Sequence, residues 1–247
     1  MYRLSCSELW GGIKNEDVDA CSRTVTASLY SSACAGGKGG DIYYLSVCGG
    51  DALTRIAVAD VQGHGETVSR VSQWLYDLLQ THMNDLEGDK ILADLNRLAG
   101  ERGFEAITTA ALVGVYRTDS HAYFSYAGHY PVLLRRHEEQ RWTPVTLDTP
   151  VSKLANLPLG VERDASFDQR KLPVKSGDQL LFYTDGVIET PDRNGQLFGR
   201  ARLDAVLKEV GKAEPFALKS AVLSALRRHA DGELAHDDVT LLAIEVF

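Results

Sequence analysis

Apolar and polar positions along the chain follow a strand-like rhythm in some segments and a helical rhythm in others. Runs rich in β-branched and aromatic residues predict strands at 41–48 and 54–59, and the Gly49-Gly50-Asp51 turn between them suits a hairpin. Residues 1–35 are expected to form short strands around a loop at residues 10–17. The same criteria predict further strands at residues 107–116, 122–127, 132–135, 142–147, 179–184 and 239–246.

Helical spacing of apolar residues marks four other segments. After Gly65 the apolar positions recur every three or four residues toward Met83, which is typical of an amphipathic helix. A second helix is predicted with Asp89 as its N-cap and an end near Gly100 or Gly103. Two more helices are predicted, at residues 200–210 and 215–228, whereas no element is predicted within residues 148–172.

The order of these elements indicates the fold class. Strand pairs, a pair of helices, more strands, a second pair of helices and a last strand favour an α+β sandwich. The sequence has no internal repeat, low-complexity tract or linker, so a single domain over residues 1–247 is expected. With 44% hydrophobic and 24% charged residues, the chain has enough material for a packed core.

Charge and hydropathy exclude some classes of partner. The chain has 26 basic and 34 acidic residues, a net charge of -8, so nucleic acid and anionic membranes are not expected partners. No apolar stretch approaches the length of a membrane span, and the first residues lack a secretion signal. A cytoplasmic location is therefore expected. The four cysteines, Cys6, Cys21, Cys34 and Cys48, form no CxxC pair, so reduced thiols are expected rather than a zinc site.

Candidate chemistry lies in four acidic segments. Asp41 follows two glycines, Asp60 and Asp185 each end a predicted strand, and Asp237 precedes the last strand. Mg²⁺ and Mn²⁺ prefer oxygen ligands, and only a fold that brings these distant segments together could form a cluster able to activate water. Each aspartate alone could instead be an ordinary turn residue. Together they indicate metal-dependent hydrolysis rather than binding alone.

A histidine in the second acidic segment has two interpretations. His64 could donate a proton to a leaving oxygen, because the usual pKa of histidine lies near the working range, or it could hold a loop carbonyl. The sequence has no nucleophile elbow, phosphate-binding P-loop or dinucleotide turn, which disfavours a covalent nucleophile.

The ordered set of motifs resembles the metal-dependent (type-2C) serine/threonine phosphatases. The amino-acid sequences of the motifs are most similar to the bacterial branch of that family. This branch includes the sporulation stage II phosphatase and stress-response phosphatases acting on anti-sigma-factor antagonists. The resemblance covers about residues 36–247. It is carried by Gly39-Gly40-Asp41, Ala59-Asp60 with Gly63-His64-Gly65, Ala127-Gly128-His129-Tyr130-Pro131, Pro158-Leu159-Gly160, Tyr183-Thr184-Asp185-Gly186 and Asp237-Asp238-Val239-Thr240.

The resemblance implies both a fold and a site. The fold would be a four-layer αββα sandwich with central antiparallel sheets and two Mn²⁺ or Mg²⁺ ions at one end. Position by position, the metal ligands would be the carboxylates of Asp41, Asp60, Asp185 and Asp237 and the backbone carbonyl of Val61. A water bridging the two ions would then attack phosphorus in line.

The resemblance also implies a function, with two alternatives. The expected activity is hydrolysis of phosphoserine or phosphothreonine on a cytosolic regulatory protein, of the anti-sigma-factor antagonist type. The first alternative is a pseudophosphatase that serves as a binding module, and the second is a metallophosphoesterase acting on small molecules. The sequence leaves the oligomeric state open, including a homodimer.

Overall fold

Two antiparallel sheets form the centre of the molecule. The computed structural model describes residues 6–34, 37–48, 52–63, 66–82, 85, 87–148 and 155–247. The first sheet has the order β1 (Cys6–Lys14), β4 (Lys38–Cys48), β5 (Leu53–Val61), β6 (Thr108–Tyr116), β7 (His121–Ala127) and β10 (Gln169–Pro173). The second has the order β2 (Glu16–Cys21), β3 (Val25–Ser32), β12 (Val239–Val246), β11 (Gln179–Tyr183), β8 (Leu133–Arg135) and β9 (Trp142–Pro144).

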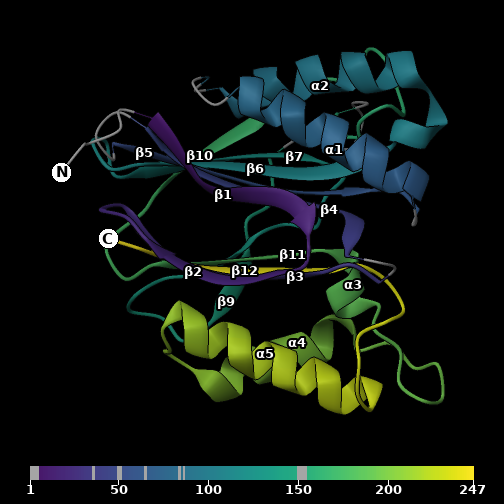
Figure 1. The fold of residues 1–247 in the computed structure, drawn as a ribbon. Helices are drawn as coiled ribbons and strands as arrows, with labels where there is room; N and C mark the ends of the chain where they lie inside the picture. Colours follow the sequence, from purple (N-terminus) through teal and green to yellow (C-terminus); the bar gives the residue numbers. More distant parts are fainter. Residues whose placement is uncertain are drawn as a thin grey trace.

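Helices cover the outer face of each sheet, which gives four layers (Figure 1). The helices α1 (Glu66–Thr81) and α2 (Gly88–Arg102) pack on the first sheet. The helices α4 (Gly199–Val210) and α5 (Pro215–Ala230) pack on the second. Two short helices, η1 (Phe104–Ala106) and α3 (Asp185–Ile188), follow α2 and β11. The αββα sandwich expected from the resemblance is confirmed.

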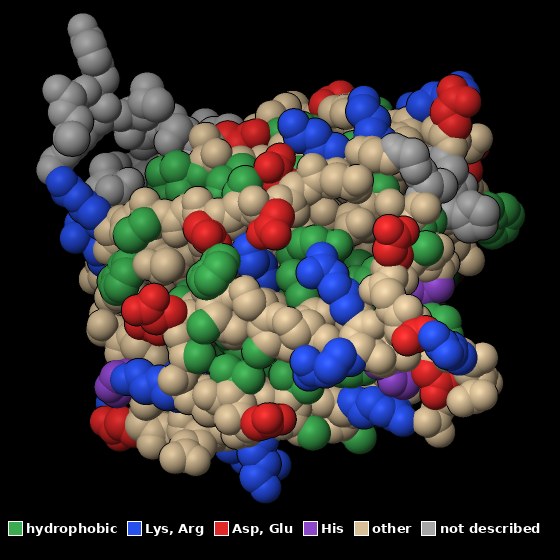
Figure 2. All heavy atoms as spheres, turned by 60° about the horizontal axis from the view of Figure 1, so that its bottom comes forward, with side chains coloured by type: hydrophobic (Ala, Val, Ile, Leu, Met, Phe, Trp, Pro, Cys, Tyr) green, Lys and Arg blue, Asp and Glu red, His purple; other side chains and the backbone are tan. Residues whose placement is uncertain are grey.

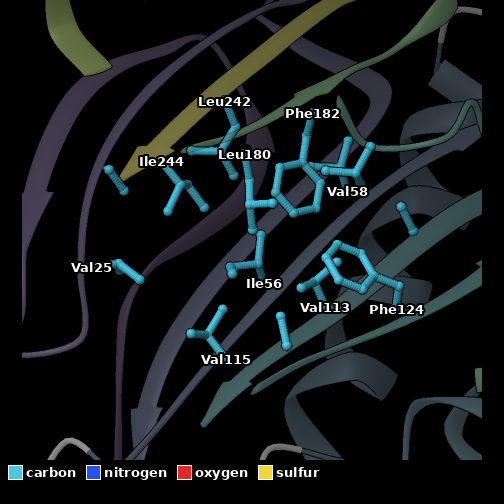
Figure 3. Close-up of a cluster of buried hydrophobic side chains, with 14 of the residues drawn as sticks. Val25, Ile56, Val58, Val113, Val115, Phe124, Leu180, Phe182, Leu242 and Ile244 are labelled. Atoms are coloured by element: carbon cyan, nitrogen blue, oxygen red, sulfur yellow. The ribbon is translucent and has the colours of Figure 1, made fainter. Parts of the chain in front are cut away.

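Alternate residues of a strand point to opposite faces of the sheet and so belong to different apolar cores. In β5, Ile56 and Val58 are fully buried between the two sheets, together with Phe124 and Phe182 (Figure 3). The intervening residues Ala57, Ala59 and Val61 face the other way and pack under α1 and α2. Because a strand with both faces buried must be apolar at nearly every position, the continuous apolar run of β5 is explained by its place in the middle of the sandwich.

The structure corrects three sequence-based predictions. The loop expected at residues 10–17 is absent from the described chain, because β1 continues to Lys14 by pairing with β4 and β2 begins at Glu16. Helix α2 begins at Gly88 with Glu87 as its N-cap, so Asp89 lies in the first turn instead of capping it. Within the segment where no element was predicted, β10 pairs with β7 and closes the edge of the first sheet.

The remaining predicted elements are confirmed with small shifts of their ends. Strand β9 is the exception, since it ends at Pro144 rather than continuing to Leu147. The Gly49-Gly50-Asp51 turn lies outside the described residues, but the antiparallel pairing of β4 and β5 that it was expected to allow is present. None of the helices in the described residues is long and apolar enough to cross a membrane.

Candidate metal centre

Strand register brings the first two predicted aspartates together. Strands β4 and β5 are antiparallel neighbours, and Asp41 is the direct register partner of Asp60. Asp60 in turn pairs with Thr109 of β6. Opposite residues of an antiparallel pair hold their side chains close together. Two carboxyl groups that lie about twenty positions apart in the sequence therefore meet at one end of the first sheet.

The second sheet supplies the other two aspartates at the same end. Asp185 is the first residue of α3, directly after β11, and Asp237 lies just before β12. Strands β11 and β12 pair so that Tyr183 lies opposite Leu241, which places the end of one strand beside the beginning of the other. Burial and then repulsion from the nearby Asp237 carboxylate raise the pKa of Asp185.

A threonine connects the two halves of the cluster. The Oγ1 atom of Thr184 donates a 2.8 Å hydrogen bond to Oδ2 of Asp41 and accepts a 3.0 Å bond from the backbone N–H of Thr240. Asp41 is 3% exposed, and its other oxygen, Oδ1, has no hydrogen-bond partner among the described residues. An unpaired buried carboxylate oxygen is unfavourable unless a cation balances it.

The electrostatics of the cluster favour a cation. Burial, with repulsion from Asp41, Asp185, Asp237 and Asp238, raises the pKa of Asp60 to about 9. Burial, then repulsion from Asp237, raises the pKa of Asp185 to about 6, and burial raises that of Asp41 well above its ordinary value. Several carboxylates in one partly desolvated site repel each other. A divalent cation that prefers oxygen ligands relieves this repulsion. The donor set therefore fits Mg²⁺ or Mn²⁺.

Two glycines permit a close approach of the backbone at this centre. A Cβ atom at Gly40 would lie 2.8 Å from the carbonyl oxygen of Val61, and one at Gly186 would collide with the carbonyl oxygen of Asp238. Any larger residue would displace these segments. The Val61 carbonyl thus lies beside the backbone of the strand that carries Asp41, where it could serve as a further oxygen ligand.

The adjacent aspartates Asp237 and Asp238 have different environments. Asp238 is buried, and its carboxylate accepts a 2.7 Å hydrogen bond from the N–H of Cys34 and another from the N–H of Gly40. Asp237 is less buried and lines the cleft. The sulfur of Cys34 lies within 4.8 Å of both carboxylates, but burial and the charge of Asp238 raise the pKa of its thiol to about 11. A protonated thiol is a poor ligand for a hard cation.

A cleft of about 380 Å³ opens over the aspartates. Asp60, Asp185 and Asp237 contribute to its lining, and so do residues that the sequence analysis did not assign to the site. These are Gln62, Gly63, Ile107, Thr109, Pro158 and His236. His236 could have been found from its position next to Asp237, whereas Thr109 is brought to the site by its register with Asp60, which the sequence does not give. The predicted proton donor His64 lies outside the described residues.

Comparison with known proteins gives one family and several relatives. Residues 50–247 match the family described as stage II sporulation protein E (SpoIIE). The phosphoserine phosphatase RsbU of Bacillus subtilis (strain 168) is 24% identical over 191 residues, 76% of this chain. The match covers 54% of RsbU, so this chain spans about half the length of that relative.

Solved structures share the fold at low sequence identity. The RsbU and RsbW domains of Rv1364c from Mycobacterium tuberculosis match 95% of this chain and 61% of that chain, with a TM-score of 0.75 and 24% identity. RsbX in complex with magnesium matches 94% of this chain and 100% of that chain, with a TM-score of 0.69 and 15% identity. Both likenesses place the present chain in the same two-sheet architecture.

Proposed function

Because the chain belongs to the stage II sporulation protein E (SpoIIE) family, we propose that it is a metal-dependent phosphatase acting on phosphoserine or phosphothreonine. The observation that carries the proposal is the convergence of Asp41, Asp60, Asp185 and Asp237 at one end of the sandwich, where their repulsion leaves a net need for positive charge. The likeness to RsbU, named as a phosphoserine phosphatase, supports the same activity.

The proposed ligands are the four carboxylates and the backbone carbonyl of Val61, holding two Mn²⁺ or Mg²⁺ ions. The magnesium in the RsbX structure supports the choice of metal. When bound, such ions supply an acidified water as nucleophile and offset charge on the phosphoryl group.

The protein's own residues fix the geometry of this centre. Thr184 orients the Asp41 carboxylate by a hydrogen bond, and Asp238 holds the backbone of Gly40 in place. Ile107 and Pro158 contribute apolar side chains to the lining of the cleft. Proton donation to the leaving oxygen by His64 stays a prediction.

The proposed substrate is a phosphorylated regulatory protein of the cytosol, of the anti-sigma-factor antagonist type. The resemblance of the motifs to the bacterial branch supports this choice, and the similarity to RsbU supports phosphoserine as the group that is hydrolysed. The cleft lies at the surface between β-strand ends and loops, so a phosphorylated side chain on a folded partner could enter it.

The test is phosphate release from an aryl phosphate and from a phosphoserine peptide. Metal-stripped protein should be inactive in excess chelator, and Mn²⁺ or Mg²⁺ should restore hydrolysis of both substrates, with thiol alkylation having no effect. Full activity in chelator would refute the metal centre. Metal binding without turnover would indicate a pseudophosphatase, and turnover of small phosphoesters but of no phosphopeptide or phosphoprotein would indicate a small-molecule enzyme.

A further inference from the structure

A second hollow, of about 490 Å³, lies on the side of the molecule covered by α4 and α5. One wall comes from β9 and the residues before it, and the other from α4. We call it the basic groove; its lining residues are Gln140, Arg141, Trp142, Pro144, Arg200, Asp204 and Lys208. Figure 2 brings this side forward, and lysine and arginine side chains lie on it among hydrophobic ones.

The polar groups of the basic groove are mostly hydrogen-bond donors. Arg200 pairs with Asp204 through a 2.7 Å contact from Nε to Oδ1. Arg141 and Lys208 are exposed, and neither has an ion-pair partner among the described residues. The indole of Trp142 is 7% exposed, and its N–H is buried, so only the ring contributes to the lining. The lining therefore contains three cations, Arg141, Arg200 and Lys208, and one carboxylate, Asp204, on a chain whose net charge is -8.

The basic groove is connected to the metal centre by two stacked tyrosines. Nη1 of Arg200 donates a 3.4 Å hydrogen bond to Oη of Tyr183, the last residue of β11. The ring of Tyr183 stacks on Tyr130 with centroids 5.9 Å apart. Asp185 follows Tyr183 by two residues, a span of at most about 7 Å along the chain. Tyr130 is itself 39% exposed and close enough to Asp185 and Glu189 to interact electrostatically with both.

We propose that the basic groove binds acidic residues of the phosphoprotein substrate that flank its phosphorylated serine or threonine. The inference rests on the proposed phosphatase function, because the metal centre would hold the phosphate of the same segment. Charge complementarity identifies the occupant: aspartate and glutamate side chains offer acceptors to the exposed side chains of Arg141 and Lys208. The apolar faces of Trp142 and Pro144 can cover the methylene groups of those side chains.

The test uses two phosphoserine peptides, one with flanking glutamates and one with glutamines in their place. The variant Arg141→Glu/Lys208→Glu reverses two exposed charges of the basic groove. The control variant Arg117→Glu/Arg228→Glu makes the same change in net charge at exposed positions outside it. Hydrolysis is measured with Mn²⁺, and binding of an unphosphorylated glutamate peptide is measured separately by fluorescence anisotropy.

We expect wild type and control to prefer the glutamate peptide in kcat/KM by about tenfold, and the groove variant to lose that preference. The groove variant should also bind the unphosphorylated peptide about tenfold more weakly, with kcat/KM on aryl phosphate unchanged. Retained preference in the groove variant, or an equal loss in the control, would overturn the proposal. So would binding of inorganic phosphate at Arg141 and Lys208 without binding of the peptide. If nothing is hydrolysed but the binding pattern holds, the phosphatase function fails and the basic groove stands.

Discussion

The Asp60 carboxyl group is expected to lower the stability of the metal-free protein. It lies among four other acidic side chains, and its pKa is raised to about 9 from an ordinary value of 3.8. A folded-state pKa above the unfolded value means that the folded protein binds the proton more tightly. Without metal, the charged form therefore weakens the fold, and stability falls as pH rises through the interval between these two values.

This predicts a pH-dependent stability that metal abolishes. In chelator, the free energy of unfolding should fall between about pH 5 and pH 8, by at most about 1.4 kcal/mol per pH unit for one proton. Asp60→Asn should flatten the decline, and Mn²⁺ should remove it in the wild type. Thermal melts across this range, with and without Mn²⁺, measure the effect. A melting temperature that rises with pH in chelator would contradict it.

The types and positions of the candidate ligands could be predicted from the sequence, but their contacts could not. Asp41, Asp60, Asp185 and Asp237 could be singled out because each borders a strand or a glycine turn. Their neighbourhood could not be derived, since the pairing of Asp41 with Asp60 depends on strand register. The same limit applies to Thr184, whose bond to Asp41 joins residues 143 positions apart.

The two adjacent aspartates before β12, Asp237 and Asp238, have different structural roles. Asp237 faces the cleft, whereas Asp238 ties the backbone after β3 and the beginning of β4 to β12 through the N–H groups of Cys34 and Gly40. Hydrogen bonds to a charged group contribute more than neutral ones, and losing the acceptor leaves buried N–H groups unpaired. The two residues should therefore respond differently to mutation.

Asp237→Asn should lower metal-dependent turnover by at least about a hundredfold and change the melting temperature little, because it removes a proposed ligand at a partly exposed position. Asp238→Ala should lower the free energy of unfolding by about 2–4 kcal/mol. Paired denaturant titrations and kinetics at saturating Mn²⁺ make the comparison. If Asp237→Asn unfolds as easily as Asp238→Ala and keeps its turnover, the division of roles is wrong.

Long elements with a clear period could be predicted, and short ones set by tertiary contacts could not. Helices α1, α4 and α5 and strands β5, β6 and β12 follow from their apolar spacing. Helix α3 has one turn, and β10 has a mixed burial pattern that only its pairing with β7 explains. Residues 10–14 belong to the expected loop, but hydrogen bonding to β4 makes them part of β1.

The packing of the two sheets explains why the candidate metal centre lies at one end of the sandwich. Two sheets packed face to face present strand ends from β4, β5, β11 and β12 at one end of the sandwich, and the apolar core between them keeps these ends aligned. The family match and the shared fold of RsbX agree with this arrangement. The basic groove would add recognition of the substrate to the same rigid frame.

Anomalous diffraction at the manganese edge, from crystals grown with Mn²⁺, can show directly whether the four aspartates hold two metal ions. We expect two anomalous peaks in the cleft, about 2.0–2.3 Å from carboxylate oxygens of Asp41, Asp60, Asp185 and Asp237, with the Val61 carbonyl also in contact. Crystals of Asp60→Asn grown identically should show the peaks weakened or lost. Well-ordered wild-type crystals with no anomalous density among these aspartates, at a Mn²⁺ concentration that supports turnover, would show that this cluster is not the metal centre.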